Sequence, residues 1–224
     1  MKRQKLDDRT LPSYTRGEEI FNMVSHIVGG GIGIAAVFLC VIFAAIHKNP
    51  YGMVGSAIYG MTMIILYTCS SIYHGLRPEL KAKKVFQVID HCSIFILIAG
   101  TYTPICLSAL REFSPRLCWL LLGTVWFAAV LGITLNAIDL KRYSVFSCIC
   151  YLAMGWAIVG AHSAYNYLAE RGGIWLLASG GVAYTIGVIF YGLQKKYKYM
   201  HSVFHIFVVA GSVLQMLYIL LYIV

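Results

Sequence analysis

The segment that decides the fold is the last hydrophobic stretch of the chain, YMHSVFHIFVVAGSVLQMLYILLYIV, which runs from Tyr199 to Val224. Its length and apolar character predict a helix that crosses a membrane, because a span needs about 20 apolar residues. His201 and His205 stand four residues apart near its start, so they share one helix face with Cβ atoms about 5–6 Å apart. Two imidazoles at that separation can bind one metal ion. Alternatively, the two histidines pack against polar groups of other helices or lie in the headgroup zone of the membrane. The pair alone does not distinguish these roles from metal binding.

The composition of the chain predicts a membrane protein. Of its 224 residues, 59% are hydrophobic and 12% are charged, whereas a soluble domain has about 45–50% apolar and about 25% charged residues. The net charge of +9 lies mainly in short loops. This placement favours topology determinants and contacts with anionic lipids over nucleic-acid binding. The seven cysteines lie in apolar stretches without a CxxC pair, so we interpret them as buried hydrophobic residues.

Seven stretches are long and apolar enough to be spans, and they predict an all-α fold, a seven-transmembrane helix bundle. They cover approximately residues 22–46, 52–76, 86–109, 116–138, 143–164, 174–193 and 200–224. The short connections predict that neighbouring helices are antiparallel. We therefore expect residues 1–20 to form a short basic cytoplasmic tail and residues 21–224 to form the seven-span membrane domain.

Lys and Arg are distributed unevenly between the two sides of the predicted bundle. One side carries fourteen of them, in the tail and three loops: Lys2, Arg3, Lys5, Arg9, Arg16, Arg77, Lys81, Lys83, Lys84, Lys141, Arg142, Lys195, Lys196 and Lys198. The other side carries four: Lys48, Arg111, Arg116 and Arg171. The positive-inside rule then predicts a cytoplasmic N-terminus and an extracytoplasmic C-terminus. We expect a multi-pass protein of the cell (plasma) membrane.

Polar residues in four predicted spans, or directly before the first of them, gather at the cytoplasmic depth. They are Glu19, Asn22, His26, Ser70, His74, Asp90, His201 and His205. Ionisable groups inside a span are costly and usually face the bundle interior or a watery cavity. His74, His201 and His205 could supply three imidazoles to Zn²⁺, which in catalytic sites has three protein ligands and an open position for water.

The other members of this cluster have candidate roles around that metal. Asp90 could bind it directly, or hold its water and act as a general base. Ser70, one turn before His74, could hydrogen-bond that water or a substrate carbonyl. The candidates for orienting the ligands are Glu19, Asn22 and His26. In the alternative interpretation, Asp90 stabilises the start of a helix and His74 caps the end of another, as the helix dipole favours.

Four short motifs in this cluster resemble those of the progestin and adiponectin receptor family, which includes the bacterial hemolysin III proteins. They read EIFNMVSH at 19–26, SSIYH at 70–74, IDHCSI at 89–94 and HSVFH at 201–205. The first, second and fourth match the family patterns ExxNxxxH, SxxxH and HxxxH, and the third resembles its aspartate motif. The motifs occur in the family's order, and the likeness covers all seven spans. One departure is His91, where the receptors carry tyrosine.

This resemblance has implications for fold, metal and activity. It implies a seven-helix bundle with a cytoplasmic N-terminus. It implies a zinc ion held by His74, His201 and His205, with Asp90 reaching the metal through water. It also implies kinship to membrane hydrolases that cleave amide bonds in lipids such as ceramide.

Three functions follow as hypotheses. The first is a zinc-dependent intramembrane hydrolase acting on a lipid amide or ester bond. The second is a non-enzymatic, zinc-stabilised sensor or regulator of membrane homeostasis. The third is a cytolysin, or hemolysin, and the absence of a polar stripe suited to lining a channel counts against it. Membrane lipids are the expected partners. The sequence leaves open the substrate, the oligomeric state and the choice among zinc, iron and manganese.

Overall fold

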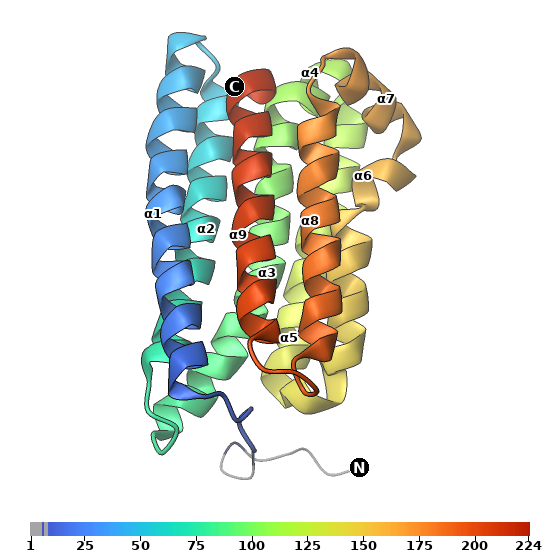
Figure 1. Ribbon diagram of the computed structural model, residues 1–224. Helices are drawn as coiled ribbons and strands as arrows, with labels where there is room; N and C mark the ends of the chain where they lie inside the picture. Colours follow the sequence, from blue (N-terminus) through green and yellow to red (C-terminus); the bar gives the residue numbers. More distant parts are fainter. Residues whose placement is uncertain (1–5, 7–8) are drawn as a thin grey trace.

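The computed structural model describes Leu6 and residues 9–224, and every regular element in these residues is helical. Most of the first eight residues of the predicted tail, namely 1–5, 7 and 8, lie outside the described part. In chain order the elements are α1 (Arg16–Ile46), α2 (Pro50–Gly75), α3 (Lys81–Pro104), η1 (Ile105–Leu110), α4 (Arg111–Phe113), α5 (Pro115–Gly155), α6 (Ala157–Gly160), α7 (His162–Glu170), α8 (Ile174–Leu193), α9 (Met200–Tyr218) and η2 (Ile219–Ile223). The long helices stand side by side as a bundle, with the start of α1 and the C-terminus at opposite ends (Figure 1).

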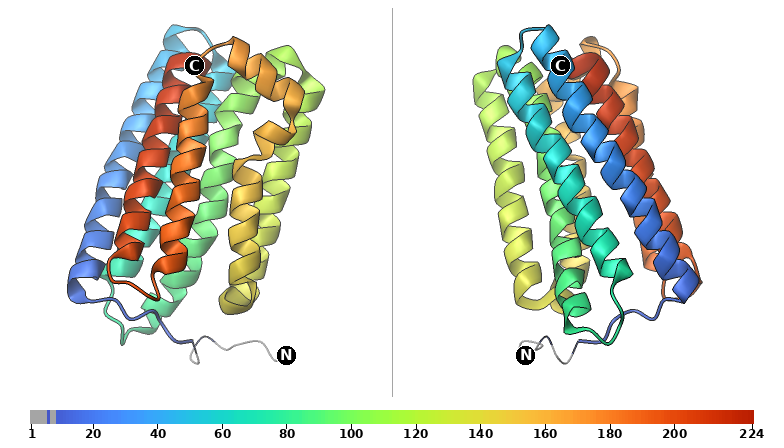
Figure 2. Two further views of the ribbon diagram at one scale, coloured as in Figure 1. Left: turned by 45° about the vertical axis from the view of Figure 1, so that its right-hand side comes forward. Right: turned by 90° about the vertical axis from the view of Figure 1, so that its left-hand side faces the viewer.

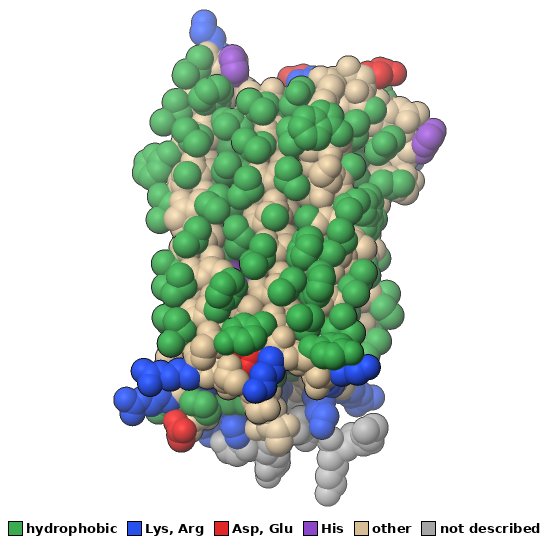
Figure 3. Space-filling model, in the orientation of Figure 1, with side chains coloured by type: hydrophobic (Ala, Val, Ile, Leu, Met, Phe, Trp, Pro, Cys, Tyr) green, Lys and Arg blue, Asp and Glu red, His purple; other side chains and the backbone are tan. Residues whose placement is uncertain are grey.

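Six helical stretches of the described chain are long and apolar enough to cross a membrane. They are Arg16–Ile46, Pro50–Gly75, Lys81–Phe113, Pro115–Gly155, Ile174–Leu193 and Met200–Ile223. Large apolar side chains such as Phe38, Phe127 and Val145 face outward. The face of the molecule drawn in Figure 3 shows a broad apolar band, below which Lys and Arg side chains gather. An apolar surface of this extent requires a lipid environment, so the chain is a multi-pass membrane protein.

Helix α1 begins at Arg16, several residues before the start expected from hydropathy near residue 22. Thr15 and Glu18 form a capping box that sets this start. Glu18 N donates to Thr15 Oγ1 at 3.3 Å, and Thr15 N donates to Glu18 Oε2 at 2.8 Å. Two backbone amides that the helix start leaves open are thereby satisfied. As a result Asn22 and His26 lie well inside the helix, on its buried face.

The stretch expected as the fifth span, residues 143–164, is not one helix, and that prediction was wrong. Helix α5 is interrupted at Asp139, whose φ of −157° and ψ of 92° are not helical. Two legs run side by side from this turn (Figure 2). The second leg ends at Gly155, and the short helices α6 and α7 follow.

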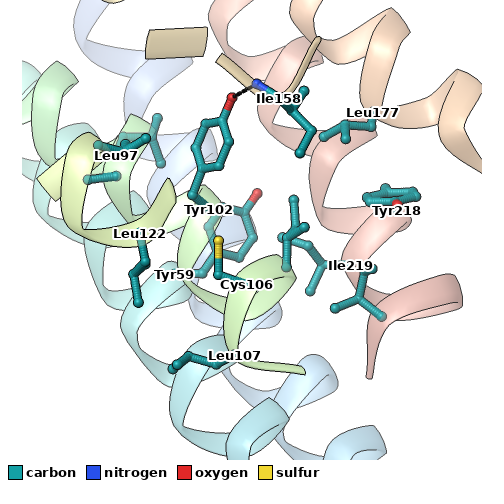
Figure 4. Packing of buried hydrophobic residues seen from close by; sticks show 14 of the residues in the cluster. Tyr59, Leu97, Tyr102, Cys106, Leu107, Leu122, Ile158, Leu177, Tyr218 and Ile219 are labelled. Atoms are coloured by element: carbon teal, nitrogen blue, oxygen red, sulfur yellow. Dashed lines mark hydrogen bonds between the residues drawn. The ribbon is translucent and has the colours of Figure 1, made fainter. Parts of the chain in front are cut away.

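Tyr102 from α3 holds the broken part of the chain in place (Figure 4). Its hydroxyl donates to Gly155 O at 3.1 Å and accepts from Ile158 N at 3.1 Å. Backbone groups that a broken helix leaves open at membrane depth must find such partners. The apolar cluster around this contact includes Cys106 and Leu177. Hydropathy does not predict the break, because the compensating hydroxyl comes from a distant helix.

Small residues let the helices that carry the polar cluster approach closely. A Cβ atom at Gly60 would lie 2.8 Å from Val37 N, and one at Gly55 would lie 2.6 Å from Pro104 Cα. Glycine is therefore required where α2 packs against α1 and α3. These contacts fix the height of α2, and with it the position of His74, relative to both neighbours.

Candidate metal centre

The structure brings together the three histidines that the sequence predicts as ligands. His74 lies in the last turn of α2, and His201 and His205 lie on one face of α9; all three are buried. One ligand atom from each lies within 4.8 Å of the others. His201 Nε2 and His205 Nε2 are 3.1 Å apart. Bonds of 2.0–2.1 Å in a tetrahedral arrangement give neighbouring nitrogens a separation of about 3.3–3.4 Å. The group could therefore hold a metal ion, with the His201–His205 pair already close to the required separation.

Glu19 and Lys83 fix the orientation of His74. His74 Nδ1 lies 2.6 Å from Glu19 Oε2, and Lys83 Nζ lies 2.8 Å from Glu19 Oε1. A carboxylate in this position makes Nδ1 the protonated nitrogen, so the lone pair of Nε2 is directed at the other histidines. His74 Nε2 is buried without a hydrogen-bond partner among the described residues. Such an orphaned buried atom fits a metal ligand.

Two residues predicted to orient the ligands, Asn22 and His26, contact His205 from α1. His205 Nδ1 lies 3.3 Å from Asn22 O. This carbonyl can accept only a hydrogen bond, so it also leaves Nε2 as the metal-facing nitrogen. The His26 ring stacks on His205 with centroids 3.6 Å apart. Asn22 also accepts a hydrogen bond of 2.7 Å from Ser202 Oγ. The first predicted motif thus meets α9 at the histidine pair.

Asp90 stands apart from the three ligands. It is not in the group whose ligand atoms lie within 4.8 Å of one another, but it lines a cavity together with His201, His205 and Ser70. Helix α3 begins at Lys81 and has no acid in its first turn. Asp90 therefore does not stabilise the start of that helix, and this alternative interpretation was wrong.

The cavity extends from the histidines into the apolar part of the bundle. Its volume is about 150 Å³. The lining near the histidines includes His26, Ser70, Asp90, His91, His201 and His205. The walls are largely apolar, with Leu66, Ile94, Leu97, Ile98, Leu177, Val188 and Val208, and they also include Thr101, Thr185 and Gln215. Ser70 Oγ is buried without a hydrogen-bond partner among the described residues. The arrangement can hold an apolar chain whose polar group reaches the histidine end.

Sequence reasoning missed Tyr14 and Lys83 as parts of this site. The Tyr14 ring stacks on His201 with centroids 5.0 Å apart, and its hydroxyl donates to Gln194 Oε1 at 2.6 Å. Burial raises the pKa of Tyr14, so its hydroxyl stays neutral. Lys83 belongs to a run of basic residues that resembles any cytoplasmic loop. Burial distinguishes Lys83 from its neighbours, and the sequence does not show it.

Comparison with known proteins places this geometry in a family. The family model described as "Haemolysin-III related" matches residues 14–216. Hemolysin-3 of Bacillus cereus is 35% identical over 206 residues, which cover 92% of each chain. The Hemolysin-3 homolog of Bacillus subtilis (strain 168) is 36% identical over 209 residues, covering 93% of this chain and 96% of the relative.

A human protein shows the same likeness at a greater distance. The Monocyte to macrophage differentiation factor of Homo sapiens is 26% identical over 162 residues, covering 69% of this chain and 64% of that protein. The resemblance read from the four motifs is confirmed, because the family model spans all of them. The chain belongs to the haemolysin-III-related family of membrane proteins.

Proposed function

We propose that this protein is a zinc-dependent intramembrane hydrolase that cleaves an amide or ester bond of a membrane lipid. The observation that carries the proposal is that two members of the buried histidine cluster, His201 and His205, line a largely apolar cavity together with Asp90. An acyl chain in the cavity would bring the bond next to its headgroup toward the histidines. Water attack on the carbonyl carbon would then break the bond between carbon and nitrogen or oxygen.

The residues around the cavity have distinct tasks in this proposal. A bound zinc ion would polarise the carbonyl group and make a water molecule a stronger nucleophile. The Asp90 carboxylate would take a proton from the attacking water and pass it to the leaving nitrogen or oxygen. Ser70 Oγ, which has no hydrogen-bond partner among the described residues, would donate to the substrate carbonyl oxygen. Glu19 would keep His74 in its metal-binding tautomer.

The proposal includes seven spans and a cytoplasmic N-terminus in the plasma membrane. The turn at Asp139 divides α5 into two legs, each of which would be one crossing. The Lys and Arg side chains that gather below the apolar band, here called the Lys and Arg belt, lie at the end where α1 starts (Figure 3). The positive-inside rule expects this for a cytoplasmic N-terminus. The histidine cluster would then lie near the cytoplasmic surface.

The decisive experiment combines metal analysis with lipid turnover. Purified wild-type protein should contain one metal ion per chain, and His74→Ala, His201→Ala and His205→Ala should lose it. Asp90→Asn should keep the metal while hydrolysis of phospholipid or ceramide falls about 10²–10⁴-fold. His162→Ala, at an exposed position, is the matched control and should change neither value. Full metal content without fatty-acid release from any of these lipids would contradict the hydrolase proposal.

A non-enzymatic regulator is the second candidate, and the separation of Asp90 from the three histidines favours it. A metal there would join α2 to α9 and contribute to folding stability. In that case Asp90→Asn would leave both metal content and cellular phenotype intact. A phenotype lost with the metal retained would support the hydrolase instead.

A further inference from the structure

We propose that the end of the bundle opposite the histidines carries a binding site for a phosphate group. A polar pocket of about 460 Å³ lies there between the α1–α2 connection, α4, the end of α7 and the end of the chain. None of its residues belongs to the histidine cluster, so it is a separate site. It is lined by three cationic side chains, Lys48, Arg111 and Arg171, with Tyr51 and Asn49 beside them.

The charge of the pocket is unusual for this end of the molecule. Four of the 18 Lys and Arg residues lie here, and three of the four converge on the pocket. Glu112 is the single acidic side chain in the lining, which also contains the terminal carboxylate of Val224. Glu112 lies 3.9 Å from Arg171, and both side chains are well exposed, at 57% and 35%. An ion pair of that length in water is weak. Three cationic groups against these two anionic groups leave the pocket with net positive charge.

Arg111 is oriented before any ligand arrives. Its guanidinium lies over the Tyr51 ring, 3.6 Å from the centroid, and its Nε donates to Leu107 O at 3.1 Å. No hydrogen bond joins its two terminal amino groups to the described residues. A guanidinium held in this way can donate both terminal groups to two oxygens of one phosphate.

Two other side chains of the pocket are also held by contacts. Arg171 Nη1 donates to Tyr167 Oη at 3.0 Å. Lys48 follows the C-cap of α1 with a left-handed backbone, φ 55°, the conformation in which helices commonly end. Asn49 Nδ2 donates to Ser108 Oγ at 2.6 Å, joining α2 to η1 beneath the pocket. Cations from three separate segments suit the several oxygens of a phosphate better than the two of a carboxylate.

Binding in nonionic detergent tests the proposal and distinguishes two sources of the phosphate. The probes are inorganic phosphate, dihexanoyl-phosphatidylglycerol, and dihexanoylglycerol as the phosphate-free control. Calorimetric titration and the thermal unfolding midpoint report binding. Wild-type protein should bind the phospholipid saturably and not bind dihexanoylglycerol. Binding of inorganic phosphate as well would identify the free anion as sufficient, whereas binding of the lipid alone would identify a headgroup site.

The variants locate the site. Arg111→Gln should weaken phospholipid binding at least about tenfold, the effect of one charge-assisted hydrogen bond. Arg116→Gln removes an equal charge from the same end outside the pocket and should bind as wild type does. Lys48→Gln, at an exposed position, should also weaken binding and serves if Arg111→Gln does not fold. Equal affinities of Arg116→Gln and both pocket variants would overturn the proposal, as would failure of wild type to bind either phosphate probe.

Discussion

Three residues from three helices, Lys83, Glu19 and His74, form a line of contacts that ends at the histidine cluster. Lys83 Nζ also donates to Tyr73 O at 3.0 Å and Leu76 O at 2.9 Å. The lysine therefore satisfies carbonyls at the end of α2 while it neutralises the carboxylate that orients His74. A buried charge without such partners would be costly. Lys83 therefore stabilises the Glu19 carboxylate, and that carboxylate in turn orients His74.

Replacing Glu19 by Gln should lower metal affinity about 10–100-fold, because residues that hydrogen-bond a ligating histidine set its tautomer and basicity. Lys83→Met should have a smaller effect, since the carboxylate remains beside His74. Competition with a chromophoric chelator measures both affinities. Glu79→Gln, at an exposed position, should match wild type. Metal affinity unchanged in Glu19→Gln would show that His74 does not depend on this carboxylate.

The sequence predicts the members of the site better than their contacts. His74, His201 and His205 are recognisable because helical spacing and span order bring them to one depth. Lys83 is not recognisable in this way. It stands in a run of basic residues, and whether its side chain is buried depends on where α1 places Glu19. Tyr14 precedes α1 in a polar tail, and its stack on His201 depends on the direction in which that tail leaves the helix.

At the scale of elements, hydropathy predicts where apolar helices lie but not where they break. Both legs of α5 are apolar, so hydropathy predicts that each of them is a helix suited to a membrane. The break after Gly155 requires a hydroxyl from α3 to satisfy two backbone groups, and a long-range partner of this kind leaves no local pattern. The early start of α1, in contrast, rests on Thr15 and Glu18, whose spacing is a recognisable capping box.

Tyr102→Phe should therefore lower the free energy of unfolding by about 1–3 kcal/mol, because it leaves the buried amide of Ile158 without its hydrogen-bond acceptor. Thermal unfolding in detergent measures the effect. Tyr218→Phe is a matched control, since Tyr218 is also buried but its hydroxyl has no partner among the described residues. We expect Tyr218→Phe to be neutral or stabilising. Equal stability of the two variants would mean that the break is held by apolar packing instead.

The whole molecule has two chemically different ends separated by an apolar band. Lys and Arg side chains gather at the end at which α1 starts (Figures 1 and 3). The histidine cluster lies toward this end, in the last turn of α2 and the first turns of α9, and the polar pocket lies at the other end. If the belt faces the cytoplasm, a lipid from the inner leaflet would meet the histidines, and the pocket would meet headgroups of the outer leaflet. The orientation of the bundle therefore decides which leaflet each site serves.

Labelling of introduced cysteines in intact cells tests both orientation and span number. Lys48→Cys, Lys141→Cys and Lys196→Cys place a thiol at exposed positions in three connections. A membrane-impermeant maleimide should label Lys48→Cys from outside, and it should label the other two only after permeabilisation, because the first leg of α5 returns residue 141 to the cytoplasmic side. The parent chain with its seven cysteines gives the background. Labelling of Lys196→Cys but not Lys48→Cys in intact cells would reverse the orientation. Labelling of both in intact cells would mean an even number of crossings between them and would contradict the seven-span arrangement, and labelling of Lys141→Cys from outside would contradict the first crossing of α5.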